Sequence, residues 1–141
     1  MQPDLDRTDY RALARFRFLI RHFLQFSEAA ARKEGLEPQQ HQMMLVIRAW
    51  EGSDGPTIGQ VAEQLLIRHH SAVGLVDRLE ERELVERSRQ AEDRRQVRLR
   101  LTARGQSVLR HLSQAHHAEL GDLGPQLVDA LSELLEGVSS K

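Results

Sequence analysis

The chain has 141 residues, of which 40% are hydrophobic and 29% charged, and its formal net charge is −1. This composition is typical of a soluble globular protein and argues against a disordered, collagen-like or coiled-coil chain. The absence of cysteine excludes disulfides, thiolate metal sites and thiol-based oxidant sensing. No apolar run approaches the length of a membrane span and the N-terminus is acidic and polar, so we expect one cytoplasmic domain over residues 1–141 with no membrane contact.

Residues 7–34 are predicted to form one long helix, because apolar side chains recur at helical spacing. These side chains are Leu13, Phe16, Ile20, Phe23 and Leu24, and the apolar surface is widened by Phe18, Leu19 and Phe26. A helix that is apolar on several sides must bury more than one stripe. We therefore expect one face to pack on the protein's own core and another on a second chain.

A second helix is predicted from Pro38, a residue suited to the first helical turn, to about Trp50. Thr57 and Gln60 then have the spacing of a capping box, in which each side chain bonds the backbone amide of the other residue. The short helix that they begin is expected to end near Leu66.

Another helix is expected after a turn near Ile67 and Arg68, and it should run to about Glu83. Its first turn is polar and basic, while its apolar side chains share one arc. Two short helices joined by a few residues, the second exposing polar side chains at its start, are typical of a helix-turn-helix.

Residues 84–89 and 97–101 are predicted to be short strands joined by a polar loop, which makes a small hairpin. Residues 84–101 contain six arginines and three acidic residues, a local charge of +3 in a nearly neutral chain. Such a patch favours contact with a polyanion, although a solvated charged hairpin has the same composition.

Helix is expected to resume after Thr102, which can cap it, and to continue to Leu120. A break is predicted over residues 121–125, followed by a last helix to Val138. The fold class is therefore mainly α with a small β-hairpin wing. The assigned regions are a winged helix-turn-helix over residues 57–101 and dimerisation helices over residues 7–34 and 103–138.

In a winged helix, the second helix of the helix-turn-helix enters the DNA major groove and the hairpin reaches the flanking minor groove or backbone. Arg94 and Arg95 fall at the tip of the predicted wing, where a guanidinium can enter the negative potential of a narrow minor groove. The neighbouring Asp93 is better explained as a group that orients an arginine than as an acid catalyst.

The sequence resembles the MarR (multiple antibiotic resistance regulator) family of winged-helix transcription factors over essentially the whole chain. The resemblance is carried by the order of elements, by LVDRLEERELVER, and above all by DRRQVRLRLTARG, which matches the family's D-x-R wing, hydrophobic strand and L-T-x-x-G. It implies that Arg95 is the wing arginine of the minor groove and that Asp93 supports it. Glu83 departs from the family, which commonly has glycine there; a left-handed backbone at this residue would cost about 1 kcal/mol.

The same resemblance implies a homodimer formed by the first and last helices, bound to a pseudo-palindromic operator in double-stranded DNA. Such proteins usually repress transcription, and small aromatic acids or other ligands often relieve the binding. The candidate DNA contacts besides the wing tip are Arg68, His69, His70, Ser71, Arg78 and Arg87. For Arg78 an ion pair within its own helix is an equally good explanation, and Arg98 and Arg100 are expected on a solvated face.

A small aromatic or phenolic ligand would find apolar and aromatic side chains between the first two helices. The candidates are Phe23, Phe26, His41, Met44 and Trp50, with Met43 beside them. Ordinary core packing explains the same cluster, and His41 is its one polar member.

Histidines 41, 111, 116 and 117 suggest a metal site, but their spacing is not the four-residue interval of helical chelation, so no metal or other cofactor is expected. No residue set supplies a nucleophile with an orienting group and an oxyanion hole, so an enzyme is not expected either.

The leading hypothesis is a homodimeric, sequence-specific DNA-binding regulator, a repressor relieved by a ligand. The alternatives are a winged-helix interaction module without DNA binding and a metal-responsive regulator.

Overall fold

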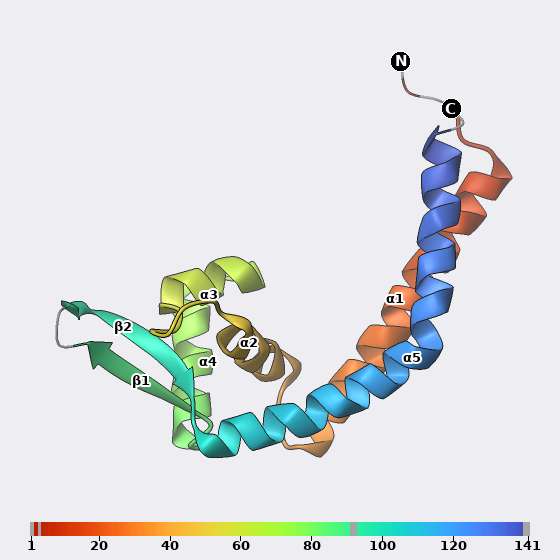
Figure 1. Cartoon of the computed structure of the whole chain (residues 1–141). Coiled ribbons are helices and arrows are strands. Elements are labelled where there is room, and N and C mark those ends of the chain that lie inside the picture. The colour runs from red at the N-terminus through yellow and green to blue at the C-terminus, as the bar shows by residue number, and fades with distance from the viewer. Residues whose placement is uncertain (1, 3, 91–92, 140–141) are drawn as a thin grey trace. The chain divides into compact units, whose positions relative to one another are not determined.

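The computed structural model describes residues 2, 4–90 and 93–139, and the side chains of residues 90, 93–95 and 139 lie outside that description. The elements are α1 (Arg7–Lys33), α2 (Pro38–Ala49), α3 (Ile58–Leu65), α4 (His69–Glu81), β1 (Val85–Gln90), β2 (Asp93–Leu101) and α5 (Ala103–Ser139) (Figure 1). They divide into two compact units: a helical unit, Met1–Ala30 with Gln114–Lys141, and a winged-helix unit, Ala31–Ser113. The fold class is the predicted one, mainly helical with one hairpin.

The helical unit is built from most of α1 and the larger part of α5, which lie side by side (Figure 1). Its core is formed by Leu19, Leu123 and Ala130, with Phe16, Phe23 and Leu127 packed against them. An ion pair of 3.2 Å joins Arg15 of α1 to Glu133 of α5 on the surface. None of the described helices is both long enough and apolar enough to cross a membrane.

The break predicted over residues 121–125 is wrong, because α5 continues through Pro125 to Ser139. Proline inside a helix removes a backbone hydrogen bond and costs about 3 kcal/mol. Leu123 before the proline, and Leu127 and Ala130 after it, all pack into the core that contains Leu19. Fully burying a leucine side chain contributes roughly 1.5–3 kcal/mol, so packing on both sides of the proline outweighs its cost.

The core of the winged-helix unit is shared by its helices and its hairpin. Its fully buried large side chains include Leu36, Met43, Met44, Val61, Val76, Leu79, Leu84, Val85, Leu99 and Leu112. Contacts link α2 with α3, α4 and β2, and α3 with α4. The two helices of the helix-turn-helix therefore pack against α2 and against the hairpin.

The predicted hairpin is present, and its second strand is longer than expected. β1 and β2 are antiparallel, with Val85 opposite Leu101 and Arg89 opposite Val97. An irregularity next to Arg89 lets Gln90 pair with Asp93, so β2 begins at Asp93 and not at Val97. Backbone pairing needs no apolar side chain, which is why the alternating pattern that marks residues 97–101 did not reveal the polar start of the strand.

Two non-glycine residues among those described adopt a left-handed backbone, and each follows a helix of the helix-turn-helix. Leu66 has φ 56° and caps the C-terminus of α3. Glu83 has φ 58° just beyond α4, which confirms that this position needs the conformation glycine favours. The chain therefore tolerates a strained backbone in the segment before α4 and in the segment after it.

Candidate nucleic-acid interface

The predicted capping box fixes the start of the helix-turn-helix. The Thr57 hydroxyl accepts from the Gln60 amide at 3.1 Å, and the Gln60 side-chain oxygen accepts from the Thr57 amide at 2.9 Å. The short α3 that follows buries Val61 and Ala62 and ends at Leu66. The short turn after Leu66 then leads into α4.

α4 has one buried face and one exposed polar end. Ala72, Leu75, Val76 and Leu79 are buried in the winged-helix unit. The side chains of Arg68, His69, His70 and Ser71, at the start of the helix, are all exposed. Four of the residues predicted to contact DNA from α4 therefore lie together at its exposed N-terminal end, whereas Arg78 lies in its last turn.

The first turn of α4 is also suited electrostatically to a phosphate. Arg68, at the N-cap, makes no side-chain capping bond, and the first turn contains no acidic residue. A helix N-terminus with free N–H groups attracts anions through those donors and through the helix dipole. The neighbouring Arg68 adds a full positive charge at the same end.

Arg87 connects β1 to α4 through two ion pairs. One guanidinium nitrogen lies 2.7 Å from Asp77 Oδ1 and another lies 2.8 Å from Glu80 Oε1. The hydrogen bond to Asp77 raises the pKa of Arg87 above its usual value; partial burial opposes this, and the charge of Glu80 adds to it. Sequence reasoning assigned Arg87 to a phosphate and missed this contact, although Asp77 and Glu80 lie three residues apart and so share a helix face.

Of the carboxylates Asp77, Glu80 and Glu81 that surround Arg78 in the sequence, the first two are engaged elsewhere. Asp77 and Glu80 both bind Arg87, and no ion pair joins Arg78 to any carboxylate among the described side chains. The Arg78 side chain is exposed on α4. Of these two arginines, Arg78 therefore has the guanidinium that is available to an anion.

The hairpin is anchored to the segment before α3. The amide of Leu99 donates to the carbonyl of Pro56 at 2.8 Å, and Arg98 donates to the carbonyl of Gly55 at 3.3 Å. Gly55 has φ +83°, and a Cβ there would collide with the carbonyl oxygen of Leu99. Arg98, expected on a solvated face, is thus half-buried and positions the wing, while Arg100 is exposed as expected.

The base of the hairpin is fastened by the residues of the L-T-x-x-G motif. The Thr102 hydroxyl donates to the carbonyl of Glu83 at 2.7 Å and accepts from the amide of Gly105 at 3.0 Å, which confirms Thr102 as the cap of α5. A Cβ on Gly105 would collide with the carbonyl of Leu84. The first turn of α5 therefore lies directly against the connection between α4 and β1.

The most specific prediction from the sequence is that Asp93, Arg94 and Arg95 form the DNA-contacting tip of the wing. The side chains of Asp93, Arg94 and Arg95 lie outside the described part of the structure, and their predicted role in the minor groove stays a prediction. The backbone of β2 begins at Asp93, so these residues start the second strand of the wing. Arg89 on β1 is exposed, which adds a cation to the described part of the hairpin.

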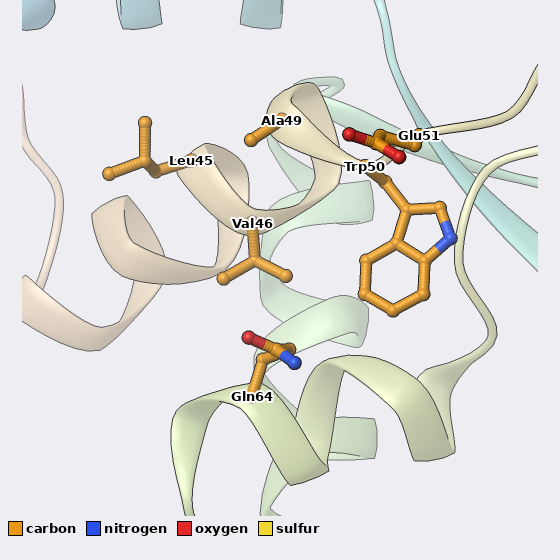
Figure 2. A pocket seen from close by; sticks show the side chains of 6 residues that line it. All are labelled: Leu45, Val46, Ala49, Trp50, Glu51 and Gln64. Atoms are coloured by element: carbon orange, nitrogen blue, oxygen red, sulfur yellow. The ribbon is translucent and has the colours of Figure 1, made fainter.

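The candidate ligand residues are distributed over both units. In the helical unit, the rings of Phe23 and Phe26 lie 5.9 and 5.5 Å from that of His116 in edge-to-face geometry. In the winged-helix unit, His41 and Met44 are buried. Trp50 lines a cavity whose other lining residues are Leu45, Val46, Ala49, Glu51 and Gln64 (Figure 2). That cavity includes neither His41 nor Met44.

Two of the histidines considered as metal ligands make polar contacts with side chains that are not histidines. His111 Nδ1 lies 2.6 Å from Glu34 Oε1, and His116 Nε2 lies 2.7 Å from the hydroxyl of Ser27. Within the described residues, no three histidine, cysteine or acidic side chains are grouped so that they could hold a metal ion.

Comparison with known proteins gives a family and a set of similar folds. A sequence model of the MarR family matches residues 34–96. The structure resembles MepR of Staphylococcus aureus in its complex with DNA, at 21% identity and a TM-score of 0.70, over 89% of this chain and 95% of that one. It also resembles AbsC, a MarR family transcriptional regulator from Streptomyces coelicolor, at 19% identity and a TM-score of 0.73, over 99% and 100% of the two chains.

A third similar structure is CouR from Rhodococcus jostii bound to p-coumaroyl-CoA. It is 24% identical, with a TM-score of 0.66 over 83% of each chain. No match to this chain was found among curated protein sequences.

Proposed function

We propose that this chain is a member of the MarR family, whose sequence model matches residues 34–96, and that it is a homodimeric regulator of transcription that binds a pseudo-palindromic site in double-stranded DNA. The observation that carries the proposal is the exposed polar start of α4 beside an arginine-rich hairpin fixed to the same helix. A DNA complex of the similar MepR supports it. The start of α4 enters the major groove and the wing reaches the adjacent minor groove.

Within α4, we assign base and phosphate contacts to the four residues 68–71 and a phosphate contact to Arg78. Backbone N–H groups at a helix N-terminus and arginine side chains are both common phosphate ligands. His69, His70 and Ser71 have donors that can reach base edges or phosphates. Successive helical residues point about 100° apart, so His69 and His70 do not both face the groove.

In the wing, Arg95 enters the minor groove, Asp93 orients it and Arg94 adds positive charge beside it. Narrow minor grooves have an enhanced negative potential that attracts guanidinium groups. Arg87 contributes by fixing β1 to α4 through Asp77 and Glu80, so its role becomes one of positioning. A rigid wing lowers the entropy lost when Arg95 is ordered on DNA.

The dimer is assigned to the helical unit. Its exposed large apolar side chains are Leu5, Tyr10, Leu13, Phe18, Leu24, Leu120, Val128, Leu131, Leu135 and Val138. So much exposed apolar surface marks an interaction site, and a second copy of the same chain satisfies it with one symmetric interface. Two recognition helices would then meet half-sites about 34–36 Å apart.

The proposed output is repression that a small molecule relieves. The structure of CouR bound to p-coumaroyl-CoA supports ligand responsiveness in a protein of similar fold. A ligand shifts the dimer away from DNA only by its differential affinity for the two states.

The wing arginine provides the test. Arg95→Ala should weaken binding to DNA from the chain's own upstream intergenic region by about tenfold, measured by fluorescence anisotropy at moderate salt, because a buried minor-groove contact is lost. Arg21→Ala removes an equal charge from an exposed position in the helical unit and should leave the affinity unchanged. Equal affinity of wild-type protein and Arg95→Ala would contradict the wing assignment and favour an interaction module without DNA binding.

A further inference from the structure

The winged-helix unit contains an open pocket of about 590 Å³ that is lined by the C-terminal part of α2, the two residues after it and one residue of α3. Leu45, Val46, Ala49, Trp50 and Glu51 line it from the α2 side and Gln64 lines it from α3. Figure 2 shows the Gln64 amide pointing from α3 toward α2, with the indole of Trp50 beside it. Its volume is within the range of small-molecule sites, roughly 300–1,000 Å³. None of its lining residues belongs to the DNA interface assigned above.

The lining combines an apolar wall, an aromatic ring and a single negative charge. Leu45, Val46 and Ala49 supply the apolar wall, and Trp50 supplies the indole. Glu51 and Gln64 make no hydrogen bond or ion pair with any side chain that the structure describes, so both retain their bonding capacity. The lining contains no lysine, arginine or histidine.

This lining favours a cationic ligand over an anionic one. The face of an indole attracts cations, and tryptophan is the best aromatic side chain for this interaction. The exposed carboxylate of Glu51 adds Coulomb attraction for the same cation and repels an anion. An aromatic carboxylate would find no basic partner in the lining and would be repelled by Glu51.

We propose that this cavity binds a small amphipathic organic cation, an aromatic amine or quaternary ammonium. The aromatic or aliphatic part of the ligand packs on Leu45, Val46 and the indole of Trp50, and its cationic centre lies near Glu51. The Gln64 amide oxygen accepts a hydrogen bond from ligands that carry an N–H. The assignment rests on the lining residues alone and does not depend on the proposed DNA binding.

Ligand binding to this pocket can be followed by intrinsic fluorescence, because Trp50 is the only tryptophan of the chain. Benzyltriethylammonium chloride is the cationic probe and sodium phenylacetate is the anionic control, both titrated at constant ionic strength while the tryptophan emission is recorded. We expect a saturable change with the cation and none with phenylacetate. A linear, unsaturable change with the cation, or saturation by both probes at similar concentrations, would overturn the assignment.

Glu51→Gln tests the charge without removing the fluorophore or changing the shape of the cavity. Loss of a partly exposed ion pair should weaken binding of benzyltriethylammonium by about fivefold. Glu63→Gln makes the same chemical change at an exposed residue of α3 that does not line the cavity, and it should bind the probe as the wild type does. If the two variants bind the cation equally, Glu51 is not its partner and the proposal fails. Far-UV circular dichroism of both variants verifies that each is folded.

Discussion

Gly105, like Gly55, is a position at which an added Cβ would collide with the backbone of another segment. A Cβ at this position would collide with the backbone carbonyl of Leu84, which has no flexible end that could move away. We predict that Gly105→Ala lowers the free energy of unfolding by about 1–3 kcal/mol, the usual cost of overpacking. Urea denaturation followed by circular dichroism measures it.

Gly59→Ala is the matched control, because it adds the same methyl group to another helical glycine of the winged-helix unit. The nearest atom to its Cβ would be the Thr57 hydroxyl oxygen, at an ordinary contact distance of 3.9 Å. Alanine also has the higher helix propensity, so the variant should be as stable as the wild type or up to about 1 kcal/mol more stable. Equal stabilities of the two variants would refute the close approach at Gly105.

Residue roles that depend on near neighbours in the sequence could be predicted, and those that depend on distant partners could not. Thr57 with Gln60, and Thr102 as a cap, followed from spacing alone, and the structure confirms both. Arg87 was predicted to contact phosphate because the sequence shows its charge but not the direction of its side chain. Its partner Asp77 lies ten residues away, across the turn from α4 into β1.

At the scale of elements, Arg87 joins the first strand of the wing to the recognition helix through two ion pairs. If Arg87 acts through Asp77 and Glu80, Arg87→Met should weaken DNA binding while leaving its salt dependence unchanged, because no phosphate contact is lost. Arg78→Met removes a proposed phosphate contact and should reduce the slope of log affinity against log salt by about 0.9. Anisotropy titrations over a salt series measure both slopes.

The opposite pattern would reverse these two roles. A reduced slope for Arg87→Met with an unchanged slope for Arg78→Met would mean that Arg87 leaves its carboxylates to bind phosphate when DNA arrives. That outcome would restore the role that the sequence first suggested for Arg87 and would remove Arg78 from the interface.

Among the elements, local signals predicted where most helices begin and end. Pro38 and Thr57 mark helix starts that the structure reproduces. The same reasoning failed over residues 121–125, where glycines and Pro125 favour a break but core packing in the helical unit continues α5. The cost of a helical proline is local and visible in the sequence, whereas the gain from Leu123 and Leu127 depends on α1, about a hundred residues earlier.

At the scale of the whole molecule, the proposed dimer would cover the exposed apolar surface of the helical unit. If the helical unit forms that dimer, Leu131→Glu should shift the protein from dimer to monomer, because a carboxylate in an apolar interface is costly to desolvate. Leu131 is 44% exposed in the single chain, so the variant should still fold. Sedimentation equilibrium measures the change in mass.

Leu66→Glu is the control for charge and for loss of a leucine. Leu66 is 92% exposed and belongs to the winged-helix unit, so this variant should stay dimeric. A wild-type protein that sediments as a monomer, or a Leu131→Glu variant that stays dimeric, would remove the helical unit from the proposed interface.

Sequence-specific DNA binding is the central claim, and selection of bound duplexes from a random pool tests it most directly because it needs no assumption about where the operator lies. The account predicts enrichment of one motif with two inverted half-sites whose centres are about one helical turn, 10–10.5 base pairs, apart. It also predicts that the selected duplex binds at least about 10³-fold more tightly than a scrambled one. A pool that shows no enriched sequence after repeated rounds, with equal weak binding to every duplex, would contradict the account.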